Sequence, residues 1–315
     1  MPPLATNEMN FLIEKSIYIR EKFLIKNLFD IIEYIFVKLV PKISQKNIIL
    51  NYFQLYSDGS IFSIVRQEKS KIYQKSKENI IKEIDKNSFA IVGNSENDIV
   101  EKGKNYFLKQ EYLFNTHVVK PQNRNLKISM NEFLYNDNCN YGSFDLKTTI
   151  NCKHLQEILI KNKVIKIAKK YLLSENIFIN SINTMLSKPS NKRHGVLKLH
   201  RDHDSMNSIT FFLYWTETDR YNGSTALLPG SHIFKHDKRF SKVYTDNISL
   251  KYLEGKPGTI YAVDTWAWHK GNENITSPRL VTWIRLSSAK SQVYFKDKNY
   301  IYEKELNNYL KSLSE

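Results

Sequence analysis

Six short β-like runs in the second half of the chain constrain the fold more than any other feature. The runs cover residues 178–186, 195–202, 208–216, 224–228, 258–263 and 279–287. The turns between them are marked by Gly223, Gly230, Gly255 and Gly258. Many short strands at close spacing predict a sandwich or a barrel of β-strands. We therefore expect an α+β chain whose core is mainly β.

Helical patterns flank these runs on both sides. Apolar residues recur at helical spacing from residue 11 to residue 56, which predicts an N-terminal helical lobe packed on the core. Residues 155–172 are amphipathic and predict one helix behind the sheet, whereas residues 93–151 predict loops with short strands. We expect an N-terminal extension at 1–70, a β-rich domain at 71–290 and a C-terminal helical tail at 291–315.

Composition narrows the class of protein. The net charge of +15 would permit nucleic acids, acidic membranes or anionic substrates as partners. The chain is also rich in Lys, Asn and Ile together, which is typical of drift in codon usage, so we do not treat the charge as evidence of function. Two cysteines, Cys139 and Cys152, form no disulfide framework. Without a signal pattern or an apolar segment that is long enough to cross a bilayer, we expect a soluble cytoplasmic protein with no membrane partner.

His200, Asp202 and His269 form the strongest chemical pattern in the chain. Side chains two residues apart on a strand point to the same side, so His200 and Asp202 share a face. A second imidazole from a later strand would complete a set of two nitrogens and one carboxylate, which suits non-haem Fe(II). A structural pair of histidines is the alternative that these residues alone leave open.

Other histidines in the chain fit a metal site less well. His203 and Asp204 crowd the same turn, but adjacent side chains diverge on a strand. His117 lies in a polar stretch without a pattern around it, and we expect it to be solvated or satisfied in the core.

An arginine follows the last histidine at the start of a β-like run. Side chains on a strand alternate between its two faces, so Arg279 and Arg285 lie on the same face as Val281 and Trp283. A buried guanidinium requires an anion, and a carboxylate can accept two parallel hydrogen bonds from it. Because Arg279 is nearer to His269, we expect it to bind a dicarboxylate, and we expect Arg285 at the far end of the barrel.

Together these segments resemble the phytanoyl-CoA dioxygenase family of Fe(II)/2-oxoglutarate oxygenases. The resemblance covers about residues 84–288, in order and in approximate spacing, and it is absent from the first 70 residues and from the C-terminal tail. Besides His269 and Arg279, the matching segments are Thr184-Met185-Leu186-Ser187-Lys188-Pro189, His200-Arg201-Asp202, Tyr214-Trp215-Thr216, Asn222-Gly223-Ser224, Leu228-Pro229-Gly230-Ser231-His232 and Gly258-Thr259-Ile260.

The resemblance implies a double-stranded β-helix, or jelly roll, with flanking helices. It implies that iron is held by His200, Asp202 and His269. It also implies that Arg279 binds the distal carboxylate of 2-oxoglutarate, with Trp215 and Met185 lining the pocket. His232 belongs to the turn motif of the family and is expected to be structural.

The chain departs from the family pattern at two positions. Gly271 stands where the family often has a hydroxyl residue, and Arg201 stands where it often has Gln. Asp202 keeps the carboxylate that halogenating relatives replace with a small residue, which argues for hydroxylation rather than halogenation.

The sequence therefore predicts an Fe(II)/2-oxoglutarate-dependent dioxygenase that uses O₂ to hydroxylate a C–H bond of a small organic substrate, with succinate and CO₂ as co-products. A nucleic-acid demethylase of the same superfamily is one alternative, which the basic charge and the arginine pair favour and the Pro-Gly-Ser-His turn disfavours. A non-catalytic jelly-roll binding protein is the other.

Overall fold

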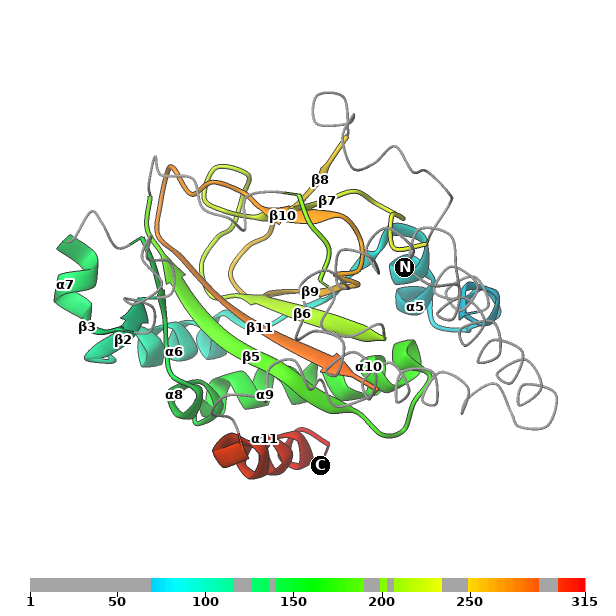
Figure 1. Ribbon diagram of the computed structural model, residues 1–315, viewed down its shortest axis with the longest axis horizontal. Helices are drawn as coiled ribbons and strands as arrows, with labels where there is room; N and C mark the ends of the chain where they lie inside the picture. The colour runs from blue at the N-terminus through cyan, green and yellow to red at the C-terminus, as the bar shows by residue number, and fades with distance from the viewer. Residues whose placement is uncertain are drawn as a thin grey trace, which may run out of the picture.

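The computed structural model describes residues 69–115, 126–135, 140–189, 199–202, 207–233, 249–288 and 300–314. The predicted N-terminal helical lobe lies outside these residues, as do His117, Cys139 and the pair His203 and Asp204. The described part is a mixed structure of helices and antiparallel sheets (Figure 1). None of its helices is long and apolar enough to span a membrane.

Two sheets form the centre of the described structure. The larger has eight strands in the order β1-β9-β6-β11-β5-β4-β2-β3, and the smaller has three in the order β10-β7-β8. The large sheet is built from β1 (Phe89–Asn94), β2 (Tyr112–Asn115), β3 (Leu126–Ser129), β4 (Tyr141–Ser143), β5 (Phe178–Ser187), β6 (Ser208–Tyr214), β9 (Thr259–Val263) and β11 (Arg279–Ser287). The small sheet is built from β7 (Thr225–Leu227), β8 (Lys251–Leu253) and β10 (His269–Gly271).

Five of the six predicted runs are strands of these sheets, namely β5, β6, β7, β9 and β11. Half of the sixth run, residues 195–198, lies outside the described residues, and in the other half His200 forms an isolated antiparallel bridge with His269. These strands were predicted as short β-like runs with turn residues between them, and most of their positions are buried because the large sheet is covered on both faces.

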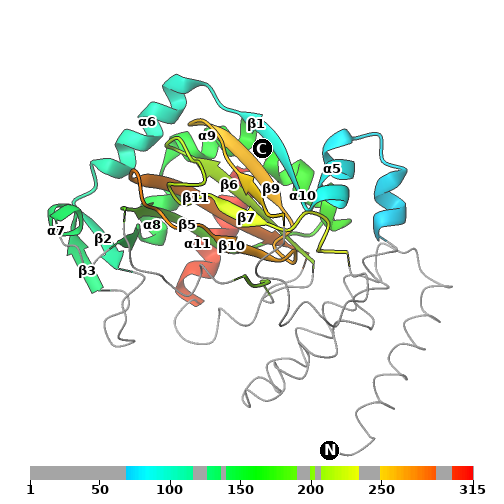
Figure 2. The ribbon, with the colours of Figure 1, turned by 90° about the horizontal axis from the view of Figure 1, so that it is seen from above.

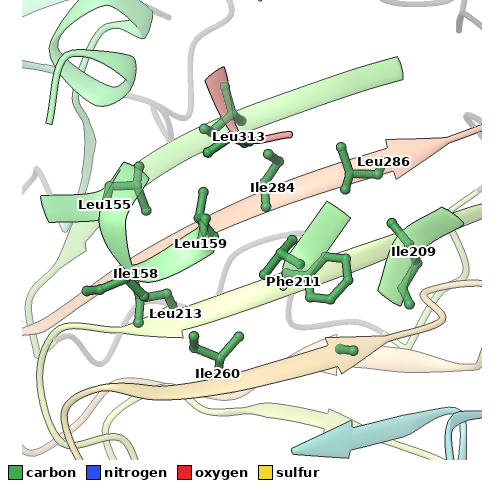
Figure 3. Packing of buried hydrophobic residues seen from close by; sticks show 14 of the residues in the cluster. Leu155, Ile158, Leu159, Ile209, Phe211, Leu213, Ile260, Ile284, Leu286 and Leu313 are labelled. Carbon is green, nitrogen blue, oxygen red and sulfur yellow. The ribbon is translucent and has the colours of Figure 1, made fainter. Parts of the chain in front are cut away.

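Helices cover one face of the large sheet, and the small sheet lies over the other (Figures 1 and 2). The covering layer includes α6 (Asn97–Leu108), α8 (Leu146–Ile150), α9 (Lys153–Lys161), α10 (Val164–Leu172) and α11 (Tyr300–Ser312). Leu155, Ile158 and Leu159 of α9 pack with Phe211 and Ile284 of the sheet in the main hydrophobic core (Figure 3). The described part also contains helical residues at 69–74, α5 (Asn79–Asn87), which precedes β1, and α7 (Met130–Tyr135).

Two expectations about helices are corrected. The single helix predicted at 155–172 is two, α9 and α10, because Lys163 has a positive φ of 54° and breaks the helical path. The stretch at 93–151 contains α6, α7 and α8 in addition to short strands. In α6 only Ile99, Val100, Gly103 and Phe107 are buried, and so narrow an apolar stripe in a polar segment gives a weak helical signal.

Alternation along β6 and β11 separates the two faces of the large sheet. Tyr214 and Val281 form a second apolar cluster with Leu227 of β7, whereas Phe211 and Ile284 belong to the core under the helices. The inner face, which faces the small sheet, carries Arg279 and Arg285 in addition to apolar residues. The side chains of both arginines therefore lie between the two sheets.

Candidate metal centre

The structure brings the three predicted metal ligands together. His200 and His269 face each other across the bridge, where the N–H of each donates to the carbonyl of the other at 2.8 and 2.9 Å. Asp202 is held close by, because its N–H donates to the carbonyl of Thr265 at 3.0 Å. One ligand atom from each of the three side chains lies within 4.8 Å of the other two.

His269 is oriented with one nitrogen toward the other ligands. Its Nδ1 donates to the carbonyl of Ala267 at 2.9 Å, since a carbonyl can only accept. Its Nε2 lies 3.6 Å from a carboxylate oxygen of Asp202, and because Nδ1 holds the proton, Nε2 of the neutral ring carries the lone pair. Burial lowers the pKa of His269 below its ordinary value, although Asp202 opposes this effect. The ring is thus kept neutral, as a metal ligand must be.

Asp202 is half-buried but stays ionised. Burial alone would raise the pKa of this carboxyl, but the positive charge of Arg285 and a hydrogen bond from Thr265 help to hold the pKa below its usual value. Arg285 donates from Nη2 to Oδ2 of Asp202, and its Nε donates to Oγ1 of Thr210 at 3.1 Å. A carboxylate and two imidazoles are the donor set that suits Fe(II), so the residues present fit that ion.

The expectation that Arg285 lies far from the site is therefore wrong. Arg285 pairs in register with Thr210 on β6, and Thr210 pairs with Val263 at the end of β9. The chain leaves β9 directly into the loop whose Thr265 holds Asp202. Cross-strand register thus places this arginine beside the carboxylate.

Arg279 lies at the other end of the same face and is buried, with 7% of its surface exposed. Its guanidinium carbon lies 5.6 Å from the centre of the Tyr214 ring, and among the described residues its Nε has no hydrogen-bond partner. Burial lowers the pKa of Arg279, although Tyr214 and Tyr141 offset part of the effect. A buried guanidinium with an unused N–H is a suitable place for an anion such as a carboxylate.

The two other predicted contacts of the co-substrate lie on opposite faces of the sheet. Met185 pairs in register with Val281 and packs against the inner cluster, on the face that carries Arg279. Trp215 lies in the core under the helices, where its Nε1 donates to Oγ1 of Thr282 at 2.8 Å. The structure therefore does not bring Trp215 to the inner face, and Tyr214 is the aromatic residue beside Arg279.

Sequence reasoning missed a hydroxyl group on the small sheet. Thr225 of β7 pairs in register with Gly271 of β10, and the next inward-facing pair is Leu227 with His269. Register partners share a face, so Thr225 and His269 point into the same space. Thr225 is 7% exposed, and no hydrogen bond of its hydroxyl is seen in the described part of the chain. In the sequence, Thr225 is marked only by its position directly after the matching segment Asn222-Gly223-Ser224. That position does not reveal that Thr225 pairs with Gly271.

Comparisons with known proteins support the fold. No protein-family model matches the sequence. Three solved structures similar to the chain are the non-heme alpha-ketoglutarate-dependent carbocyclase SnoK from nogalamycin biosynthesis, the epimerase SnoN in complex with Fe³⁺, alpha-ketoglutarate and nogalamycin RO, and EctD from S. alaskensis with 2-oxoglutarate and 5-hydroxyectoine.

SnoK is 11% identical, with a TM-score of 0.50, and the match covers 74% of this chain and 92% of that one. The SnoN complex is 11% identical, with a TM-score of 0.46 and coverage of 67% and 82%. EctD is 17% identical, with a TM-score of 0.47 and coverage of 66% and 74%. The chain therefore shares the fold of a non-heme alpha-ketoglutarate-dependent enzyme, and at the place described above it carries a His-Asp-His triad that could hold a metal ion.

Proposed function

We propose that the protein is an Fe(II)/2-oxoglutarate-dependent oxygenase of the phytanoyl-CoA dioxygenase type, which hydroxylates a C–H bond of a small organic substrate. One observation carries the proposal: two imidazoles and a carboxylate come together beside Arg285, and on the same face of the large sheet as Arg285 lies the buried Arg279, whose Nε has no hydrogen-bond partner among the described residues. The two sheets are then those of a double-stranded β-helix within residues 71–290 of the chain.

Each side chain has a definite task in this proposal. His200, Asp202 and His269 would hold the iron, each through one ligand atom. The bound metal supplies the oxidation, in which 2-oxoglutarate loses CO₂ and becomes succinate. Because Arg285 keeps Asp202 ionised and Ala267 fixes the tautomer of His269, the ligands are ready before the metal arrives.

The co-substrate binds between the two sheets. Arg279 binds its distal carboxylate, and the hydroxyl of Thr225 donates a further hydrogen bond, which replaces the one that Gly271 lacks. Tyr214 and Met185 form the wall of this subsite on the large sheet. A charge-assisted hydrogen bond is stronger where water is excluded, so the buried guanidinium of Arg279 should bind a carboxylate tightly.

The geometry weakens the case for a nucleic-acid substrate. That alternative was favoured by the basic charge and by the pair Arg279 and Arg285, but both of these arginines are buried. Arg285 pairs with Asp202, and Arg279 is enclosed beside Tyr214. Neither guanidinium is placed to contact a phosphate backbone, which proteins bind with exposed basic side chains.

A direct test measures metal uptake and succinate. The protein is titrated anaerobically with Fe(II) and then 2-oxoglutarate in a calorimeter, and succinate is measured after air is admitted. We expect binding of one iron per chain and succinate from the wild type, and neither from Asp202→Ala. Asp98→Ala is the matched control, because Asp98 is an exposed carboxylate on α6 paired with Lys102. Iron binding in Asp202→Ala equal to that of the wild type would contradict the proposal.

The substrate is sought with the same protein. Extracts of small molecules are incubated with protein, Fe(II), ascorbate and 2-oxoglutarate, and mass spectrometry is searched for a compound that gains one oxygen atom. The product is expected with the wild type and with Asp98→Ala, and is expected to be absent with Asp202→Ala.

A further inference from the structure

The two histidine ligands have neighbours that contact each other on the outer side of the site. In the antiparallel bridge His200 faces His269, so the next residues in register, Arg201 and Trp268, also face each other. Successive side chains of extended chain point to opposite sides, which places this second pair away from the ligand atoms. The guanidinium carbon of Arg201 lies 4.8 Å from the centre of the Trp268 ring, a cation–π contact.

A single turn holds both members of this pair. The carbonyl of Ser231 accepts from Nη2 of Arg201 at 3.0 Å, and the hydroxyl oxygen of Ser231 accepts from the backbone N–H of Trp268 at 2.9 Å. We call Arg201, Trp268 and Ser231 the outer clamp. Arg201 and Trp268 are each directly next to a histidine ligand in the chain, and Ser231 forms a hydrogen bond with both of them.

The turn itself is anchored to the large sheet. The hydroxyl of Ser88, directly before β1, accepts from the N–H of Gly230 at 2.9 Å and shares a hydrogen bond with Nδ1 of His232 at 2.7 Å. The carbonyl of Ser88 also accepts from the N–H of Asp264, in the loop that leads to Thr265. The turn motif is thus a fixed support behind the ligand segments, and His232 serves it rather than the metal.

The local backbone gives the ligands little regular support of their own. β10 has three residues, and His200 belongs to an isolated bridge rather than to a strand. The two backbone hydrogen bonds of this bridge set the separation of the histidines, and side-chain contacts must keep the bridge closed before metal binds. The outer clamp supplies such contacts.

We propose that Arg201 is a positioning residue of the metal centre, which through the outer clamp holds His200 and His269 at chelating separation in the metal-free protein. This inference rests on the proposed function, because it concerns the same triad. It gives a role to the residue that stands where the family often has Gln.

The test measures metal affinity rather than turnover. Co(II), a redox-stable substitute for Fe(II), is titrated into the wild type, Arg201→Ala and Arg201→Lys, and the unfolding temperature of each metal-free protein is recorded. Removal of residues that orient metal ligands typically weakens metal binding by about 10- to 100-fold, and we expect about tenfold for Arg201→Ala. Arg201→Lys should recover part of the loss, because it keeps a cation over Trp268.

Arg220→Ala is the matched control. Arg220 lies over the ring of Tyr252 at 5.0 Å and pairs with Glu254, so it has the same kind of contact at a distance from the triad along the chain. We expect Arg220→Ala to bind Co(II) as the wild type does, with an unfolding temperature close to that of Arg201→Ala.

The outcomes separate this inference from the proposed function. Wild-type affinity for Co(II) in Arg201→Ala would overturn the role of Arg201 and leave the triad intact as a metal site. Failure of the wild type itself to bind Co(II) would overturn both. If Arg201→Ala does not fold, Arg201→Lys decides: an affinity below that of the wild type supports the clamp, and an equal affinity in this variant overturns it.

Discussion

Arg285 donates a hydrogen bond from Nη2 to Oδ2 of Asp202, so a guanidinium lies directly behind the one anionic ligand of the triad. The arginine is fixed by its second hydrogen bond to Thr210, whose hydroxyl lies 3.4 Å from that of Thr265. Thr265 in turn bonds to the carboxylate of Asp202. A hydrogen-bonded network of Arg285, Thr210 and Thr265 therefore holds the carboxylate of Asp202 in place without metal.

Replacing Arg285 should make the protein depend on metal for stability. Arg285→Leu leaves the half-buried Asp202 without its cation, and about 3–5 kcal/mol, the cost of losing one partner of a fully buried pair, is the upper limit of the loss. A divalent ion restores a positive charge beside Asp202. We therefore expect a lower unfolding temperature in the metal-free variant and a larger rise on adding Co(II) than in the wild type. Calorimetric unfolding with and without Co(II) measures both.

The control for this prediction is the double variant Asp202→Asn with Arg285→Leu. It has no carboxylate to neutralise, so Co(II) should not raise its unfolding temperature. An equal Co(II)-induced rise in the wild type and in Arg285→Leu would show that the arginine does not compensate the carboxylate.

Removing the hydroxyl of Thr225 should weaken binding of 2-oxoglutarate. Thr225→Val keeps the shape of the side chain but removes one hydrogen bond to a charged group, which is worth about 1.5–3 kcal/mol. We expect the KM for 2-oxoglutarate to rise by about tenfold or more with little change in kcat, as is typical when a ground-state contact is lost. Thr225→Ser keeps the hydroxyl and should behave as the wild type; succinate formation at varied 2-oxoglutarate concentration compares the three.

Trp215 should affect stability rather than co-substrate binding. A Cβ added at Gly103 of α6 would lie 2.1 Å from Cζ3 of Trp215. Gly→Ala in a helix normally stabilises by about 1 kcal/mol, but overpacking a core costs about 1–3 kcal/mol, so Gly103→Ala should destabilise the protein. Trp215→Phe makes room and should reverse much of this loss in urea unfolding. A large rise in the KM for 2-oxoglutarate in Trp215→Phe alone would instead place this ring at the co-substrate.

Asp85 should make the protein less stable as pH rises. Burial raises the pKa of this carboxyl, although the hydrogen bond from Ser70 and the charge of Lys69 offset part of the effect. The folded state therefore binds its proton more tightly than the unfolded state does. The stability that this proton provides is complete below the unfolded pKa and is lost as pH rises through the folded pKa, at about 1.4 kcal/mol for each unit of difference.

Asp85→Asn removes this dependence, because an amide oxygen still accepts from Ser70 and carries no charge. Its urea midpoint should exceed that of the wild type by a margin that grows between pH 4.5 and pH 8. A margin that shrinks over this range would mean that the charged form of Asp85 is favoured in the folded protein.

The sequence was sufficient to predict those features that depend on residues near one another in the chain. The short β-like runs and the glycines between them predicted β5, β6, β9 and β11, because strand-forming and turn-forming residues are local properties of the chain. The pattern of two histidines and an aspartate identified the side chains that the structure brings together. The helix α6 was missed because a narrow apolar stripe is a weak local signal.

Only the tertiary structure decided which residues surround the site. Alternation shows that Arg279 and Arg285 share a face, but register with Thr210 places Arg285 beside Asp202. Likewise, Tyr214 rather than Trp215 faces inward, and Thr225 stands opposite Gly271 on a neighbouring strand. Strand pairing joins segments far apart in the chain, and its register is set by the packing of both sheets together, which no local pattern contains.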